Sequence, residues 1–283
     1  MGNGIRPLDR DDVGTLVGWA ADEGWDPGPG DAEAFWAADH DAFLGFDRDG
    51  ALSGGGAVVA YGRGLGFVGL FIVRPEIRGA GLGRELWREM LADLQSRLRP
   101  GAPIGLDAVA ALQPFYARSG FIAAHDTTRI RFGDLGAAPV GLTPLAEVPF
   151  ADLLAYDARC FGADREPFLR AWLRLEGSVG LAAVDAVGAI EGYGILRPTG
   201  AGSKIGPLFA VSAEVAERIL RGLLAERPPG QAVLDVPGAN PPAVELAERL
   251  GEGEVFRTAR MWHGDPPPIP WQHVFGMTTL ELG

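Results

Sequence analysis

Cysteine is almost absent from this chain of 283 residues. Cys160 is the only one, which excludes an intrachain disulfide and makes a cytoplasmic location the default expectation. No run of residues approaches the roughly 20 apolar positions of a membrane-spanning helix, and the beginning of the chain has no apolar core of a signal peptide. The sequence therefore predicts a cytoplasmic globular protein with no membrane partner.

Positive charge is also scarce, because 25 basic residues face 37 acidic ones and the formal net charge is −12. Nucleic-acid binding needs a basic stripe that neutralises phosphates, so we expect no nucleic-acid partner. An acidic balance suits an amine-bearing substrate, but solubility alone explains it at least as well.

Several catalytic motifs are missing. The histidines lack metal-ligand spacing, and neither an HExxH motif nor a cysteine pair is present, so no metal site is expected. The absence of a Gly-x-Ser-x-Gly elbow argues against a hydrolase.

Periodic segments separated by glycine and proline turns fill most of the chain. Helices are predicted over 11–23, 31–38, 82–98, 114–118 and 150–175. Strands are predicted over 5–8, 42–47, 51–61, 65–73, 104–109, 121–132, 179–184, 190–196 and 274–282. Small and turn-forming residues over 134–139 mark a domain boundary. We therefore predict two units, residues 1–136 and residues 137–283.

The two units resemble each other in sequence. Leu70 to Glu76 aligns with Leu208 to Glu214 at an offset of 138 (208 − 70), and Leu106-Asp107 aligns with Leu234-Asp235 at an offset of 128 (234 − 106). The second unit is therefore shorter between these points, where the first unit holds its glycine-rich segment. Two copies of one fold, with the loop kept only in the first, explain this pattern.

The glycine-rich segment, Arg78-Gly79-Ala80-Gly81-Leu82-Gly83-Arg84, lies between an apolar strand and an amphipathic helix. Glycines permit φ > 0 and close approach of a ligand, and a helix start offers free N–H groups and positive potential. The segment therefore predicts a pyrophosphate site. A P-loop needs a Lys here, and a dinucleotide fingerprint needs a third glycine at position 84, so coenzyme A is the remaining ligand.

The segment from Val73 to Gly83 resembles the signature of the GCN5-related N-acetyltransferases (GNAT), with Arg78, Gly81 and Gly83 at the family's spacing. The segment from Pro114 to Phe121, which contains Tyr116, resembles a helix end of the same family. Segments 24–28, 205–210 and 275–278 resemble the tandem YitH-like subgroup. The resemblance implies an α/β fold of two tandem GNAT-like domains, each a twisted, mostly antiparallel mixed sheet flanked by helices.

The resemblance also implies a function and its residues. The chain would be an N-acetyltransferase that transfers acetyl from acetyl-CoA to a primary amine of a small molecule by direct attack, without a metal. Backbone groups of Phe71, Ile72 and Val73 would pair with the pantetheine arm, and residues Arg78 to Arg84 would bind the pyrophosphate. Tyr116 matches the family position that protonates the departing CoA thiolate.

The general base and the acceptor pocket are less clear from the sequence. Strand 65–73 carries no acid or His, although many relatives keep a Glu there. Glu23, Asp26 and Asp107 are candidates, as is a water held by backbone carbonyls. Trp25, in a Pro/Gly loop, and Asp26 beside it are candidate substrate residues.

Two other functions stay open at this point. A non-catalytic acyl-CoA sensor of the same fold is favoured by the missing strand carboxylate, and a partner-binding protein would carry a vestigial loop. The acceptor amine is also open, and the chain is expected to be a monomer or a homodimer.

Overall fold

The computed structural model describes residues 4–283. The predicted N-terminal unit begins at residue 1, so its first three residues lie outside the described part. Its helices are α1 (Arg10–Asp22), α2 (Asp31–Ala38), α3 (Leu82–Arg97), α4 (Gln113–Ala117), α5 (Phe150–Phe161), α6 (Glu166–Trp172), α7 (Ala213–Ala225) and α8 (Pro241–Leu250). Its strands are β1 (Ile5–Pro7), β2 (Phe43–Arg48), β3 (Ala51–Tyr61), β4 (Leu65–Val73), β5 (Ile104–Ala108), β6 (Ile122–Phe132), β7 (Thr143–Pro144), β8 (Val179–Val184), β9 (Ile190–Pro198), β10 (Gly202–Ala210), β11 (Gln231–Pro237), β12 (Gly253–His263) and β13 (Val274–Gly276).

Amphipathic helices cover both faces of the sheet. In β3, Ala57 and Val59 pack in the same apolar cluster as the buried side of α1, whereas Val58 between them packs with α3. Successive strand residues point to opposite faces, so α1 and α3 lie on opposite sides of the sheet. None of the helices over residues 4–283 is both long and apolar enough to cross a membrane.

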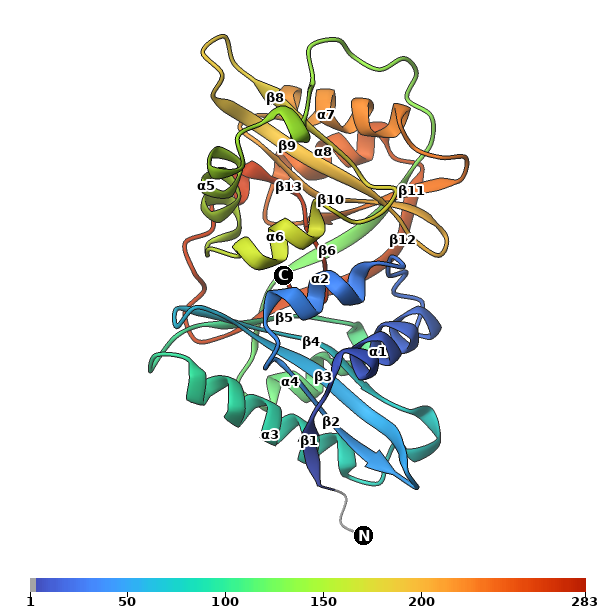
Figure 1. Ribbon diagram of the computed structural model, residues 1–283, viewed down its shortest axis with the longest axis vertical. Helices are drawn as coiled ribbons and strands as arrows, with labels where there is room; N and C mark the ends of the chain where they lie inside the picture. Colours follow the sequence, from blue (N-terminus) through green and yellow to red (C-terminus); the bar gives the residue numbers. More distant parts are fainter. Residues whose placement is uncertain (1–3) are drawn as a thin grey trace.

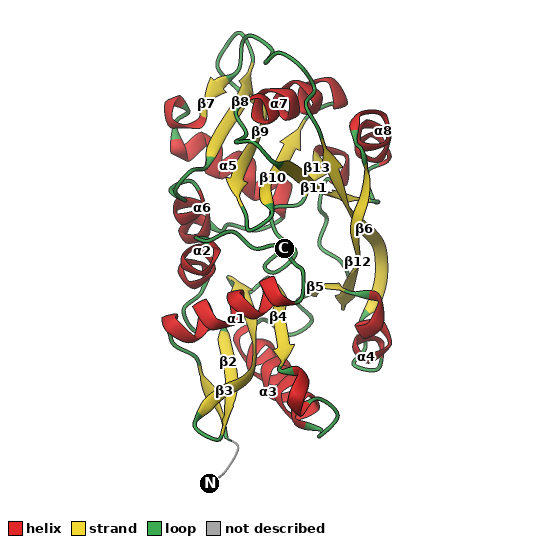
Figure 2. Ribbon diagram, turned by 90° about the vertical axis from the view of Figure 1, so that its right-hand side faces the viewer, coloured by secondary structure: helices red, strands yellow, loops and turns green. Residues whose placement is uncertain are grey.

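The two units exchange a strand. The sheet has the order β1-β2-β3-β4-β5-β12-β6-β11-β10-β9-β8-β7, with β13 attached to β10. β6 follows β5 in sequence but pairs with β11 of the second unit, and β12 of the second unit pairs with β5 of the first. β6 and β12 also pair with each other, where they pass between the lower and upper units of Figure 1, and Figure 2 shows the two strands side by side. Each unit's part of the sheet is thus completed by a strand of the other unit.

The pairing of β6 with β12 has two-fold symmetry. Arg129 lies opposite Phe256, and Arg260 lies opposite His125, so the two pairs map onto each other at one offset of 131 residues (260 − 129 and 256 − 125). Thr127 and Thr258, at the same offset, face each other at the centre, and both are buried. The prediction of two copies of one mostly antiparallel α/β fold is confirmed, and the copies meet at this centre.

Two buried ion pairs hold the exchanged strands. Arg129 of β6 donates from Nε and Nη2 to the Asp235 carboxylate of β11, at 2.7 and 2.9 Å. Arg260 of β12 donates in the same way to Asp107 of β5, at 2.9 and 2.7 Å. Burial by itself raises the pKa of Asp235, but the charge and hydrogen bonds of Arg129, with the charges of Lys204 and Arg197, outweigh it, so the net shift of that pKa is downward. The two carboxylates are those that the sequence repeat aligned.

In each unit a parallel strand pair diverges beyond a short stretch. β4 pairs with β5 only from Gly66 to Val68, and β10 pairs with β11 only from Gly202 to Ile205. In the second unit the opening is filled by β13, which pairs with β10 at Leu208 and Phe209. In the first unit no strand of the described chain enters the corresponding opening, which forms a cleft.

The end of the chain differs from the sequence prediction. The sequence predicts a strand over 274–282, but β13 ends at Gly276. Beyond it, the amide of Leu282 donates to Oγ1 of Thr279 at 2.9 Å, which closes a turn and takes that amide from strand pairing. The C-terminus lies between the two units (Figure 1).

The connection between β6 and β7 spans the residues 133–142, where the boundary was predicted. The division of the chain at residue 136 stays a prediction.

Replacing Asp235 with Asn leaves the Arg129 guanidinium buried without its countercharge. We expect the free energy of unfolding, measured by urea denaturation, to fall by about 3–5 kcal/mol, as for other buried pairs that lose one partner. Glu254→Gln is the matched control, because it breaks an exposed ion pair between Glu254 and Arg257, which both lie on the exchanged strand β12. Its expected cost is about 0–1 kcal/mol. Equal unfolding curves for the two variants would show that the ion pair does not hold the exchange.

Candidate active site

The cleft between β4 and β5 has a volume of about 540 Å³. It brings together most of the residues predicted from the sequence to bind the cofactor, namely Phe71, Ile72, Val73, Arg78, Gly79, Gly81, Gly83 and Arg84. Ala80 and Leu82 do not line it: Ala80 is exposed, and Leu82 packs toward the core beneath α3. The cleft therefore runs from the exposed end of β4 over the glycine-rich loop to the first turn of α3.

The backbone of the loop explains its glycines. Gly79 has φ of 83° and Gly81 has φ of 86°, a region that side chains with a Cβ rarely adopt. Gly81 is also the N-cap of α3, and no side chain caps that helix start. Uncapped N–H groups at the start of a 16-residue helix, open to a cleft, provide an anion site.

Arg78 is anchored at the rim of the cleft. Its Nε donates to the carbonyl oxygen of Val73 at 2.7 Å, and its Nη2 forms an ion pair with Glu23. Glu23, a candidate base, is thus engaged at the cleft mouth. Arg84 is exposed on the first turn of α3 and lines the cleft.

A β-bulge in β4 opens the cleft. Gly55 pairs with Ile72 and Ala57 with Gly69, so Leu70 and Phe71 together face the single residue Gly56. Leu70 has the unusual φ of 50° at this bulge. Bulges bend their strand and increase its twist, and here β4 leaves β5 after Val68. The β4 backbone beyond the bulge is therefore free on its β5 side to pair with an extended ligand.

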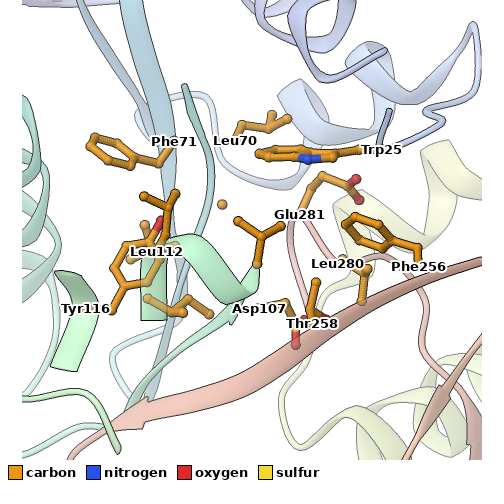
Figure 3. A pocket seen from close by; sticks show the side chains of 14 residues that line it. Trp25, Leu70, Phe71, Asp107, Leu112, Tyr116, Phe256, Thr258, Leu280 and Glu281 are labelled. Atoms are coloured by element: carbon orange, nitrogen blue, oxygen red, sulfur yellow. The ribbon is translucent and has the colours of Figure 1, made fainter. Parts of the chain in front are cut away.

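The cleft leads into a smaller inner pocket of about 40 Å³. The two cavities share the residues Trp25, Phe71, Val109, Leu112 and Phe256. The other residues that line the inner pocket are Val68, Gly69, Leu70, Leu106, Asp107, Tyr116, Thr258, Leu280 and Glu281 (Figure 3). Phe256 and Thr258 come from β12, so the exchanged strand forms part of its wall.

Tyr116 lies at the inner pocket on α4. It is 6% exposed and packs against the rings of Trp87, Phe115 and Phe121. Burial raises the pKa of its hydroxyl above the usual value, so the group is protonated at neutral pH. It can therefore donate a hydrogen bond to an anion that forms in the pocket.

The candidate acids near the cleft have partners of their own. The carboxylate of Asp26 accepts from Oγ1 of Thr199 at 2.8 Å and from the amide of Ala201 at 2.9 Å, and Asp26 lines neither cavity. Asp107 lines the inner pocket but is held by Arg260. Through these two hydrogen bonds, Asp26 connects its loop to the second unit.

Trp25 lines both cavities, and residues of β6 and β10 hold its loop through hydrogen bonds. Arg129 donates to the carbonyl oxygen of Trp25 at 2.8 Å, and the ammonium of Lys204 donates to the carbonyl oxygens of Trp25 and Asp26 at 3.1 and 2.9 Å. Lys204, the sole lysine, is 2% exposed, and burial lowers its pKa to about 8. The sole lysine of the chain is therefore buried beside the site, where it holds the loop that carries Trp25.

Glu281 is the pocket residue that sequence analysis missed. It is 3% exposed and lies on the side of the inner pocket occupied by Trp25 and Phe256, opposite Tyr116 in Figure 3. A Cβ added to Gly69 would lie 1.7 Å from the carbonyl oxygen of Glu281. An isolated glycine inside a strand pattern signals close approach of another backbone, and Gly69 was the signal available in the sequence.

Comparisons with known proteins agree with this geometry. Two sequence models described as an acetyltransferase (GNAT) domain match the chain, one over residues 31–133 and the other over residues 153–276. The chain is 28% identical over 282 residues to the holothin acyltransferase of Pseudoalteromonas sp. (strain SANK 73390), covering 98% of this chain and 94% of that protein. It is 25% identical over 281 residues to the uncharacterized N-acetyltransferase YitH of Bacillus subtilis (strain 168), covering 98% of this chain and 97% of that protein.

The fold also has a solved counterpart over its whole length. A putative acetyltransferase from Pyrococcus horikoshii superposes with a TM-score of 0.82 at 25% identity, covering 99% of this chain and 95% of that one. Both units are matched by the same family, and both full-length relatives carry acyltransferase names. The chain belongs to the GNAT acetyltransferase family, as a tandem member, and is an acyltransferase that uses an acyl-CoA donor.

Proposed function

We propose that the chain transfers the acetyl group of acetyl-CoA to the primary amine of a small molecule. The observation that carries this proposal is that the cleft over the glycine-rich loop adjoins the inner pocket, which Tyr116 lines, through shared wall residues. A CoA thioester that enters along β4 has its phosphates at the start of α3 and its acyl group near Tyr116.

The donor is held by backbone more than by side chains. Residues Arg78 to Arg84 bind the pyrophosphate through the loop amides, with Arg84 adding a charge at the first turn of α3. Phe71, Ile72 and Val73 pair with the pantetheine arm on the side of β4 that β5 has left. The inner pocket, of about 40 Å³ with walls that include Val68 and Leu106, suits an acyl group as short as acetyl.

The chemistry is a direct attack. The neutral amine adds to the thioester carbonyl, and backbone N–H groups at the β4 bulge stabilise the oxyanion. As the tetrahedral intermediate collapses, the C–S bond breaks and the sulfur takes the proton of the Tyr116 hydroxyl. Holding both reactants in line supplies much of the rate.

The acceptor lies between Trp25 and Phe256. Both rings line the passage from the cleft to the inner pocket, and two aromatic walls suit a flat or apolar amine. The name of the full-length relative, holothin acyltransferase, supports a small-molecule acceptor. Turnover of a panel of aromatic, aliphatic and polyamine substrates, followed by release of CoA thiol, tests this function. Binding of acetyl-CoA without turnover of any amine would instead favour the sensor.

The second unit does not bind a donor under this proposal. Residues 74–81 join β4 to α3, whereas only residues 211–212 join β10 to α7. The side chain of Ser212 caps α7, and β13 occupies the edge of β10 that corresponds to the pantetheine edge of β4. Both features leave no room for the phosphates or for the arm.

Calorimetric titration with acetyl-CoA is expected to give one site per chain, and Gly81→Val is expected to weaken binding at least about tenfold, which is 1.4 kcal/mol. The physical reason is that valine is strained at the φ of 86° of Gly81 and carries its methyl groups into the phosphate site. Gly62→Val is the matched control, because Gly62 also has a positive φ, of 59°, but lies in the β3–β4 turn outside the cleft. Two sites per chain, or equal losses in both variants, would contradict the assignment.

Tyr116→Phe removes the proton donor while it keeps the ring that packs on Trp87. We expect kcat to fall about 100-fold, within the range for a general acid, and the acetyl-CoA affinity to stay unchanged. Tyr156→Phe serves as the control, since that hydroxyl donates to the backbone carbonyl oxygen of Glu191 in the second unit. A Tyr116→Phe enzyme with full kcat would remove this residue from the mechanism.

A further inference from the structure

Two acidic residues line the inner pocket, and they differ in their partners. Asp107 is held by two hydrogen bonds from Arg260. The Glu281 carboxylate, by contrast, is influenced by burial and by charges at a distance, and it forms no ion pair with the residues that the structure describes. Glu23 and Asp26, the other acids near the cleft, are engaged by Arg78 and by the 199–201 loop.

The backbone that carries Glu281 is fixed on both sides. The hydroxyl of Tyr61, on β3, donates to the carbonyl oxygen of Leu282 at 2.7 Å. Arg165 of the second unit donates to Oγ1 of Thr278 at 2.9 Å. At Gly69 the missing side chain makes room for the carbonyl oxygen of Glu281 itself. The segment 277–283 therefore enters the first unit from the second and holds one carboxylate at the pocket wall.

Charged groups from several elements face this carboxylate. Lys204 on β10, Arg129 on β6 and Arg197 on β9 favour its ionised form, and Asp31 on α2 opposes it. Tyr116 of α4 lines the opposite side of the same pocket, and Asp107 of β5 is paired with Arg260 of β12. Burial is the largest effect, and the net result is a pKa raised above the usual value for glutamic acid. A carboxylate of raised pKa holds a proton better than a solvated one.

We propose that Glu281 is the general base of the acetyl transfer and accepts, directly or through one water, the proton that the amine loses. This assignment rests on the proposed N-acetyltransferase function. As the N–C bond forms and the C–S bond breaks, the proton of the amine passes to Glu281 and the proton of Tyr116 passes to the sulfur. The products are the amide and the CoA thiol, after which solvent removes the proton from Glu281 and restores that of Tyr116. A side chain from the C-terminal segment thus takes the role of the acid that strand β4 lacks.

The test compares wild type with Glu281→Gln, using an amine that wild type acetylates. We expect kcat/KM for the amine at pH 7 to fall about 100-fold, while the acetyl-CoA dissociation constant stays within about threefold. In wild type, activity must decline as pH falls through the raised pKa of Glu281, because only the carboxylate accepts a proton. This acidic limb is expected to disappear in Glu281→Gln.

A second variant separates catalysis from folding. Glu281→Ala opens space at the pocket wall, and added formate is expected to restore part of its activity, whereas formate leaves wild type unchanged. A Glu281→Gln enzyme with the wild-type rate and acidic limb would overturn the assignment. So would loss of acetyl-CoA binding or of thermal stability in both variants without formate rescue, since the residue would then be structural. If wild type binds acetyl-CoA but turns over no amine, the proposed function itself fails, and this assignment fails with it.

Discussion

The exchange of β6 and β12 between the two units is the constraint on which the rest of the structure depends. Each strand carries an arginine into a bidentate, buried pair with an aspartate of the opposite unit's fifth strand, Asp235 or Asp107. Buried charges are costly unless they are paired, so this geometry strongly disfavours other registers. The same exchange brings Phe256 and Thr258 to the pocket of the first unit and lets Arg129 hold the Trp25 loop. The pocket is therefore a product of both units.

The two copies use the same structural opening differently. In both units a strand with a β-bulge, β4 or β10, leaves its parallel neighbour. In the first unit the opening adjoins a glycine-rich loop and forms the cleft, and in the second it receives β13 of the same chain. After β13, the chain continues into the first unit, where the backbone of Glu281 lies against Gly69. The unit without the loop thus positions the C-terminal segment, which supplies the wall that contains Glu281.

The sequence predicted the parts of the fold and site that depend on local pattern. The helices before residue 176, most strands before residue 199 and the repeat follow from periodicity, and the glycine-rich loop follows from residues that must adopt positive φ, as Gly79 and Gly81 do. The strand exchange was not predictable in this way, because β6 and β12 have the same alternation whichever neighbour they pair with. Glu281 was missed because its position depends on contacts far apart in sequence, with Tyr61 and Gly69. For Glu23, Asp26 and Asp107, only the structure revealed that partners already engage the carboxylates.

An experimental structure of the chain with CoA and an acceptor amine tests the central claim, that one active site is assembled from both units. The account predicts one CoA per chain, with its arm along Phe71 to Val73 and its sulfur between Tyr116 and the Glu281 carboxylate. It also predicts that β12 and the segment 277–283 keep their places beside the ligand. CoA bound in the second unit, or a sulfur remote from Glu281 with that segment displaced, would contradict the account.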